Sequence, residues 1–183
     1  MVNRNKAKGT LWESSVRDYL NKVLGLVDET GAFRDPFSAH NVRRAAQEGA
    51  KDVGDIHCPP FILECKHVRN PAVPTWLRQA EVEAKHARFP YGVAVVKVPW
   101  ANTASGRVHF TVRTWTRVRL ALGHTTRDMR ELYAFTPTIR GLRTDRWYLT
   151  CSLRDFAQVL TDMRTSRVEG GIDAVHGRAL TLW

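Results

Sequence analysis

Residues 54–67 read GDIHCPPFILECKH and hold the pattern on which the expected fold and site both depend. The run at 61–63 is strongly apolar, as in a strand that enters a protein core, yet Glu64 and Lys66 follow directly. Side chains two residues apart on a strand share one face. The stretch therefore predicts a strand over residues 61–66 that presents a glutamate and a lysine together.

A second short strand is expected over residues 53–57, with a Cys-Pro-Pro turn at 58–60, because proline cannot donate a ladder hydrogen bond. An antiparallel pairing of the two strands brings Asp55 close to Glu64. Two neighbouring carboxylates repel each other unless a proton or a cation lies between them. Mg²⁺ takes carboxylate oxygens, keeps several waters and accepts phosphate oxygens, so it suits such a pair.

Two further groups complete this candidate site. The backbone carbonyl of Cys65 is an additional candidate ligand, and Lys66 can orient a water or steady the charge on an attacked phosphate. Two alternatives stay open. Glu64 and Lys66 can form an ordinary ion pair on an edge strand, and Asp52 competes with Asp55, although a turn-capping role is favoured for Asp52.

The same three-letter pattern recurs at residues 83–85, as Glu-Ala-Lys, inside a helix expected over residues 75–88. Positions i and i+2 of a helix point about 200° apart, so these two charges cannot share a site. Only the copy at 64–66 follows an aspartate within reach.

The other elements follow from the spacing of apolar residues. The expected elements are a helix over 10–24 that starts at Thr10 and stops at Gly25, a short strand near 39–44, a buried strand over 91–98, a half-exposed strand over 107–113, and a helix over 152–163 with Ser152 and Asp155 as its capping box. Residues 115–150 are ambiguous. The order of elements predicts an α/β sheet sandwiched by helices.

Two helical residues are further candidates for the site. Glu13 lies on the flank of the first helix's apolar stripe, from where it can reach the edge of a site, but it also fits a capping box with Thr10. Gln79 lies on the flank of the second helix's core face, and a plain surface glutamine is its alternative. His57 and His67 flank the site and are interpreted as incidental or phosphate-contacting.

The charge of the chain favours a polyanionic partner. The 183 residues carry a formal net charge of +10, and thirteen arginines but no lysine follow residue 106. Arginine binds phosphate through two parallel hydrogen bonds, and a strongly basic domain is typical of nucleic-acid binding. A bias toward arginine codons with a solvated basic surface is the alternative.

Other classes of protein are disfavoured. No segment approaches the roughly 20 apolar residues of a membrane span. Three cysteines without a CxxC pair disfavour a zinc site, and their sparse, odd number indicates reduced thiols in a cytoplasmic setting.

These residues together resemble a known family. Gly9 before Glu13, then Gly54-Asp55-Ile56, Glu64-Cys65-Lys66 and Gln79 resemble the PD-(D/E)xK nuclease superfamily, and within it the Holliday junction resolvases of archaeal and phage type. The likeness covers about residues 6–98. It departs from the superfamily's Pro-Asp pair, which Gly54-Asp55 replaces, and the chain after Val98 has no counterpart in a minimal resolvase.

The resemblance implies a fold and a domain organisation. It implies a restriction-endonuclease-like mixed sheet flanked by helices over residues 10–98. The residues themselves indicate a flexible basic arm at 1–9 before this nuclease core. Residues 99–183, which the resemblance does not cover, are expected to form a C-terminal α+β extension packed on the same domain.

The resemblance also implies an activity, a Mg²⁺-dependent (or Mn²⁺-dependent) DNA endonuclease that cuts four-way junctions as a homodimer, in the cytoplasm of a host cell if phage-encoded. It gives catalytic roles to Glu13, Asp55, Glu64, Lys66 and, more weakly, Gln79, and metal ligation to Glu13, Asp55, Glu64 and the Cys65 carbonyl. The candidate DNA contacts are Lys6, Lys8 and one of Arg43 and Arg44. A flap, nicking or restriction-type nuclease and a non-catalytic DNA-binding protein are the alternatives.

Overall fold

The structure is a computed structural model, which describes residues 4–45 and 53–176, with side chains placed for residues 7–45 and 53–166. Its centre is a seven-stranded mixed sheet in the order β1-β2-β3-β4-β5-β7-β6. The strands are β1 (Arg43–Arg44), β2 (Ile56–Cys58), β3 (Phe61–Lys66), β4 (Tyr91–Val96), β5 (Arg107–Thr111), β6 (Thr136–Thr138) and β7 (Tyr148–Ser152). Only the pair β3 and β4 is parallel, and the strands from the second half of the chain extend the same sheet.

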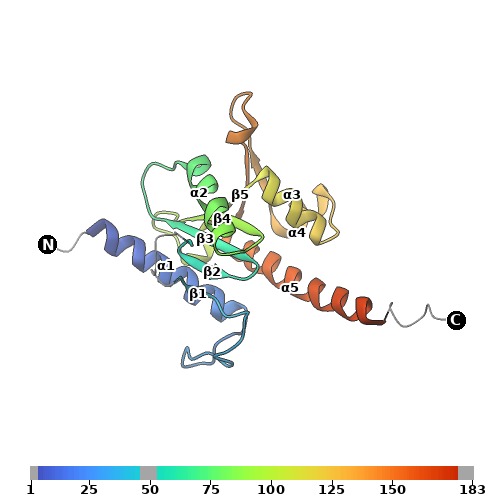
Figure 1. Ribbon diagram of the computed structural model, residues 1–183. Helices are drawn as coiled ribbons and strands as arrows, with labels where there is room; N and C mark the ends of the chain where they lie inside the picture. The colour runs from blue at the N-terminus through green and yellow to red at the C-terminus, as the bar shows by residue number, and fades with distance from the viewer. Residues whose placement is uncertain (1–3, 46–52, 177–183) are drawn as a thin grey trace.

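Five α-helices flank the sheet in the described ranges, as Figure 1 shows. They are α1 (Arg4–Val23), α2 (Val73–His86), α3 (Val112–Ala121), α4 (Thr126–Tyr133) and α5 (Leu153–His176). One face of the sheet forms the main core with α1, α3, α4 and α5, while the other face forms a smaller apolar cluster with α2. The expectation of an α/β sheet sandwiched by helices is therefore confirmed at this level.

Helix α2 connects the two parallel strands and packs closely on β4. Gly92 explains the short distance, because a Cβ atom there would lie 2.1 Å from the carbonyl oxygen of Ala80 on α2. Parallel neighbours need such a crossover helix, which covers the face of the strands it connects. The close approach presses one face of α2 onto the strand that neighbours β3.

The first helix begins earlier than Thr10, the start expected from the sequence. It starts at Arg4, so Gly9 and Thr10 lie inside it, and residues 4–9 are helical where a flexible basic arm was expected. Lysine and alanine favour helix, and one interior glycine costs only about 1 kcal/mol. Favourable neighbours therefore outweigh the single glycine.

Other boundaries shift by a few residues. Strand β2 begins at Ile56 and includes Cys58, and β5 ends at Thr111 because that side chain accepts a hydrogen bond from the Thr114 amide and starts α3. The expected capping box at the start of α5 is confirmed, since Ser152 Oγ accepts from the Asp155 amide at 3.1 Å and Asp155 accepts from Ser152. In the described part of the chain, no helix is long and apolar enough to cross a membrane.

Candidate functional site

The pairing of β2 with β3 brings Asp55 and Glu64 together. Ile56 stands opposite Leu63 in an antiparallel register, so Asp55, one residue before β2, comes opposite Glu64. The Asp55 carboxylate accepts a hydrogen bond of 2.7 Å from the Cys65 amide. Gly54, with φ at 84°, provides the left-handed backbone before it. The predicted proximity of the two carboxylates is confirmed.

Glu64 and Lys66 are not an ordinary surface pair. Strand β3 lies inside the sheet between β2 and β4, and Glu64 is only 2% exposed. The ammonium of Lys66 donates to Oε1 of Glu64. The edge-strand alternative is therefore wrong, because β3 is a central strand and Glu64 is buried in it.

Burial first, and then the charge of a neighbouring glutamate, shift both carboxyl groups toward their neutral forms. Burial, and then the charge of Glu64, raises the pKa of Asp55 to about 7, against the opposing hydrogen bond from the Cys65 amide. Burial also raises the pKa of Glu64 to about 7, against its hydrogen bond with Lys66 and with help from the charge of Glu83. At neutral pH the pair holds more protons than two free carboxyls would.

The surroundings of Lys66 favour its charged form, unlike those of the two carboxyl groups. Burial disfavours its charged form, but the hydrogen bond and charge of Glu64, with the charges of Asp55 and Glu83, outweigh burial and raise the pKa of Lys66. The amine therefore stays protonated near neutral pH. It can donate hydrogen bonds and stabilise negative charge, but it cannot accept a proton from water.

Glu13 faces the same cluster from α1. Its Oε2 atom lies 2.5 Å from Nη2 of Arg44, and its charge is among those that raise the pKa of Asp55. The capping-box alternative is wrong, because Thr10 lies inside α1 and not at its start. Glu13 therefore stands close enough to Asp55 to contribute negative charge to the site.

The structure separates the two candidate arginines of β1. Arg44 points to Glu13, whereas Arg43 donates to the Pro36 carbonyl and lies over the Phe33 ring at 4.9 Å. Successive residues of a strand face opposite sides. Arg44 therefore contacts the acidic cluster formed by Glu13, Asp55 and Glu64, whereas Arg43 contacts the loop that precedes β1.

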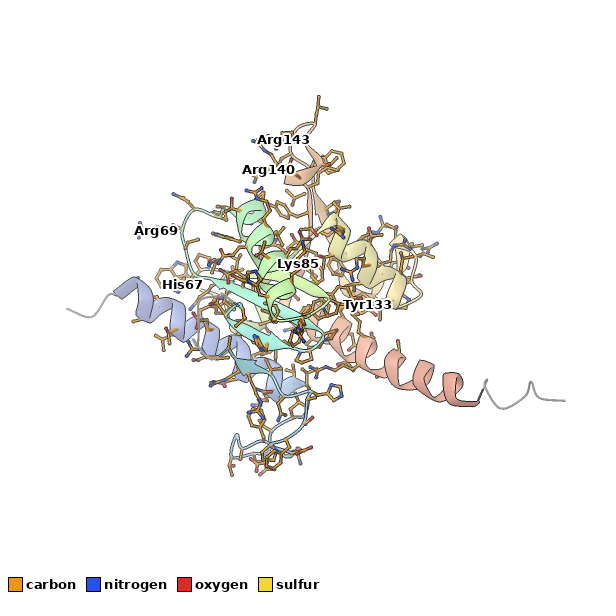
Figure 2. The ribbon with its side chains drawn as sticks, in the orientation of Figure 1. His67, Arg69, Lys85, Tyr133, Arg140 and Arg143 are labelled. Atoms are coloured by element: carbon orange, nitrogen blue, oxygen red, sulfur yellow. The ribbon has the colours of Figure 1, made fainter. Side chains whose placement is uncertain are left out.

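Helix α2 contributes a residue that sequence reasoning missed. Glu83 is 1% exposed and would lie 3.2 Å from a Cβ atom built at Gly54, and its charge acts on both Glu64 and Lys66. A signal was available, because Glu83 follows Ala80 by three residues on the apolar face of α2. Lys85 is exposed, as expected for the helical copy of the pattern, and Figure 2 labels it on α2.

Gln79 lies one turn before Glu83 and is half-buried. With Thr75, Arg78, Val82, Glu83 and His86, it lines a hollow of about 370 Å³ along α2. The structure places it near the buried glutamate and describes no contact between it and Asp55 or Glu64. A direct role for Gln79 therefore stays a prediction.

The acidic cluster offers oxygen donors of the kind that Mg²⁺ prefers. Asp55 and Glu64 supply two adjacent carboxylates whose pKa values are raised mainly by burial and also by the charges of neighbouring carboxylates. Among residues 7–45 and 53–166, no three His, Cys, Asp or Glu side chains are already grouped tightly enough to hold an ion. The donor set suits a cation that keeps several water or phosphate ligands. The role of the Cys65 carbonyl stays a prediction.

Basic residues flank the end of β3. His67 Nδ1 lies 3.5 Å from the Lys8 carbonyl, so the start of α1 adjoins the end of β3. Figure 2 shows His67 and Arg69 on this side of the molecule, following β3. Lys8 is exposed, while the side chain of Lys6 and the whole of Asp52 lie outside the described residues.

The face of the sheet that carries Glu64 continues across β4 to polar side chains on β5, β7 and β6. Glu64, Ala94, His109, Thr150 and Thr136 stand side by side in the registers of five neighbouring strands. His109 Nδ1 lies 2.8 Å from Thr150 Oγ1, and burial, with the charge of Arg107, lowers the pKa of His109 to about 4. A hollow of about 350 Å³ lies over this polar end.

Comparison with known protein families, with curated proteins and with solved structures found no match.

Proposed function

We propose that this protein is a metal-dependent DNA endonuclease that selects branched DNA, most specifically a Holliday junction resolvase. The observation that carries the proposal is the cluster of buried Glu64 with half-buried Asp55 and Lys66, which the pairing of β2 with β3 brings together and which Glu13 joins. A buried acidic pair with perturbed pKa values and an adjacent cation is typical of catalytic sites. The net charge of +10 fits a polyanionic substrate.

Asp55 and Glu64 would hold Mg²⁺ with Glu13 and the Cys65 carbonyl, and the bound ion would supply Lewis-acid stabilisation of the attacked phosphate. Hydrolysis forms one P–O bond from water and breaks one ester P–O bond, and a proton, lost by the water to solvent, is replaced by one that solvent gives to the leaving alkoxide. Lys66, kept protonated by its acidic neighbours, donates a hydrogen bond that orients the water or stabilises charge on the phosphate. Arg44 holds the Glu13 carboxylate in place at the edge of this site.

A four-way junction needs two cuts in strands of like polarity. A homodimer with two-fold symmetry presents two identical sites, which matches the symmetry of such a junction. The family resemblance supplies the junction and the dimer. A flap or nicking nuclease with the same chemistry is the second candidate.

The first prediction concerns Glu64. Glu64→Gln keeps the shape of the side chain but removes its charge, so we expect cleavage in Mg²⁺ to fall at least about a hundredfold. Binding to the same DNA should be unchanged or tighter, because a negative charge near the phosphates is lost. Cleavage is measured on labelled four-way, flap and linear DNA, and binding by fluorescence anisotropy.

A matched control and three further variants make this test specific. Glu131→Gln changes an exposed glutamate on α4 and should cut at the wild-type rate. Asp55→Asn and Lys66→Ala should lose cleavage with Glu64→Gln, and Glu13→Gln should stay folded and cut poorly. Wild-type cleavage by Glu64→Gln would overturn the proposed site, and binding without cleavage by the native chain would favour the non-catalytic alternative.

A further inference from the structure

The turn after β4 carries a tryptophan whose exposure and backbone conformation are both unusual. Trp100 is 103% exposed, and its φ is 60°. The turn is closed by a 3.4 Å hydrogen bond from the Ala101 amide to the Val98 carbonyl. A bulky residue in the left-handed region is a genuine outlier, and tryptophan is buried in most proteins. Neither folding nor packing of the described chain accounts for an indole held in solvent.

The turn lies at the same end of the sheet as the acidic cluster. The Lys97 amide donates a 2.9 Å hydrogen bond to the Lys66 carbonyl, so the chain leaves β4 beside the end of β3. Trp100 is three residues further on, and its Cα therefore lies within about 11 Å of that of Lys97. The turn that carries Trp100 therefore begins beside the strand end that holds Lys66, the residue that we propose to orient the attack on phosphate.

The base of the turn is anchored. Asn102 caps the short helix at Thr103–Ser105 by accepting from the Ser105 amide at 3.1 Å. A Cβ atom built at Gly106 would lie only 2.9 Å from the Trp12 ring, so this glycine packs directly on the indole. The indole N–H of Trp12 in turn donates to the Val95 carbonyl at 3.1 Å. A side chain that is presented from a rigid base loses little freedom on binding.

We propose that Trp100 stacks on a nucleobase at the branch point of DNA, next to the phosphate that is cut. This inference rests on the proposed function and adds a residue that recognises the branch. Aromatic side chains stack on any base, and unstacking is least costly where a base is already mismatched or unpaired. In an open four-way junction the bases beside the branch point stay paired but lose a stacking neighbour on one face, so an aromatic ring can stack there, whereas an intact duplex offers no such face.

The test measures binding without cleavage, in the Glu64→Gln background. A junction with 2-aminopurine at its branch point reports stacking of that base by its fluorescence, and anisotropy reports affinity. Trp100→Ala should weaken junction binding by about five- to a hundredfold and abolish the fluorescence change on binding, because one base–aromatic stack is lost. Trp100→Phe should retain most of both signals, and affinity for a linear duplex should be unchanged.

Two more variants separate recognition from folding. Trp100→Gly relieves the left-handed strain, so its melting temperature should equal or exceed that of the parent, while its junction affinity falls with Trp100→Ala. Leu142→Ala removes another fully exposed apolar side chain, at 99% exposure, from the hairpin between β6 and β7 and should bind as the parent does.

The outcomes distinguish this inference from the proposed function. Unchanged junction binding by Trp100→Ala, or an equal loss on junction and duplex, overturns the stacking role and leaves the nuclease site intact. Absence of cleavage by the native chain on every DNA overturns the nuclease, while a branch-specific loss in Trp100→Ala still supports stacking. No DNA binding by the native chain overturns both.

Discussion

At the scale of single residues, the site holds more negative charge than its surroundings balance. Asp55 and Glu64 are adjacent and largely removed from water, and both have pKa values raised to about 7. Such an arrangement destabilises the folded chain whenever both groups are ionised. We interpret this electrostatic cost as the physical reason why the site would bind a cation.

The charge of this pair predicts how stability depends on pH. The folded carboxyls release their protons near pH 7, whereas their ordinary values are 3.8 and 4.5, so the metal-free folded state binds more protons than the unfolded state between these limits. The free energy of unfolding should therefore fall as pH rises from 6.5 to 7.5, by on the order of 1 kcal/mol per pH unit. Melting temperatures in EDTA measure this.

The stability measurement starts at pH 6.5 in order to exclude most of the titration of His109. The pKa of His109 is lowered to about 4 from 6.5, so its titration raises stability between those values and would mask the acidic pair. Asp55→Asn should flatten the decline above pH 6.5, and Mg²⁺ should do the same in the native chain. A melting temperature that rises through this window would contradict the raised pKa values.

Sequence reasoning at this scale succeeded where local geometry decides. The alternation of a strand places Glu64 and Lys66 on one face, and the hairpin register brings Asp55 to them. Glu83 was missed, since its helix was used only to show that it cannot pair with Lys85. Its burial depends on the approach of α2 to Gly54, which is a tertiary contact that no local pattern contains.

At the scale of elements, the strands of the core were predictable and the boundaries of helices were not. β3 begins and ends at the expected residues, because an apolar run and a proline turn define it. α1 starts six residues early, since one glycine does not outweigh good helix formers on both sides. Residues 115–150 stayed ambiguous, because α3, α4 and the β6–β7 hairpin are short and find their partners through tertiary packing.

The packing of α2 makes a prediction at this scale. Gly92→Ala would place a methyl group 2.1 Å from the Ala80 carbonyl, so α2 must move away from β4. Such overpacking costs about 1–3 kcal/mol, and we expect a melting temperature lower by roughly 3–10 °C, with reduced cleavage as Glu83 shifts. Urea or thermal unfolding measures the change.

Gly9→Ala is the matched control. Gly9 lies inside α1, and the atom nearest to an added Cβ is Glu13 Oε1 at an ordinary 3.8 Å. Alanine should therefore stabilise the chain by about 0.5–1 kcal/mol. Equal stability of Gly92→Ala and the native chain would show that α2 does not approach β4 as described.

At the scale of the whole molecule, charge and shape would make different contributions to the proposed binding of DNA. Phosphate contacts release counterions and act on any DNA, whereas the geometry of two sites can respond to the shape of a junction. Basic side chains lie on separate loops, as Figure 2 shows for Arg69 in the loop after β3 and for Arg140 and Arg143 on the hairpin before β7. Affinity alone therefore cannot identify the substrate.

The final prediction separates the two contributions. If the basic surface neutralises roughly 6–8 phosphates, log K should fall with log salt at a slope of about −5 to −7 on both linear and four-way DNA. A preference for the four-way junction should remain at every salt concentration and in the presence of excess duplex, because the charge contribution is common to both shapes. A slope shallower than about −2 would contradict an extensive phosphate-binding surface.

The products and the oligomeric state complete this prediction. A homodimer should place paired, near-symmetric nicks in two strands of like polarity, since one subunit with one site would have to release and rebind between cuts. Denaturing gels with each strand labelled in turn locate the nicks, and sedimentation of the complex measures its stoichiometry. Equal cutting of duplex and junction, or one subunit bound per junction, would leave a general nuclease in place of a resolvase.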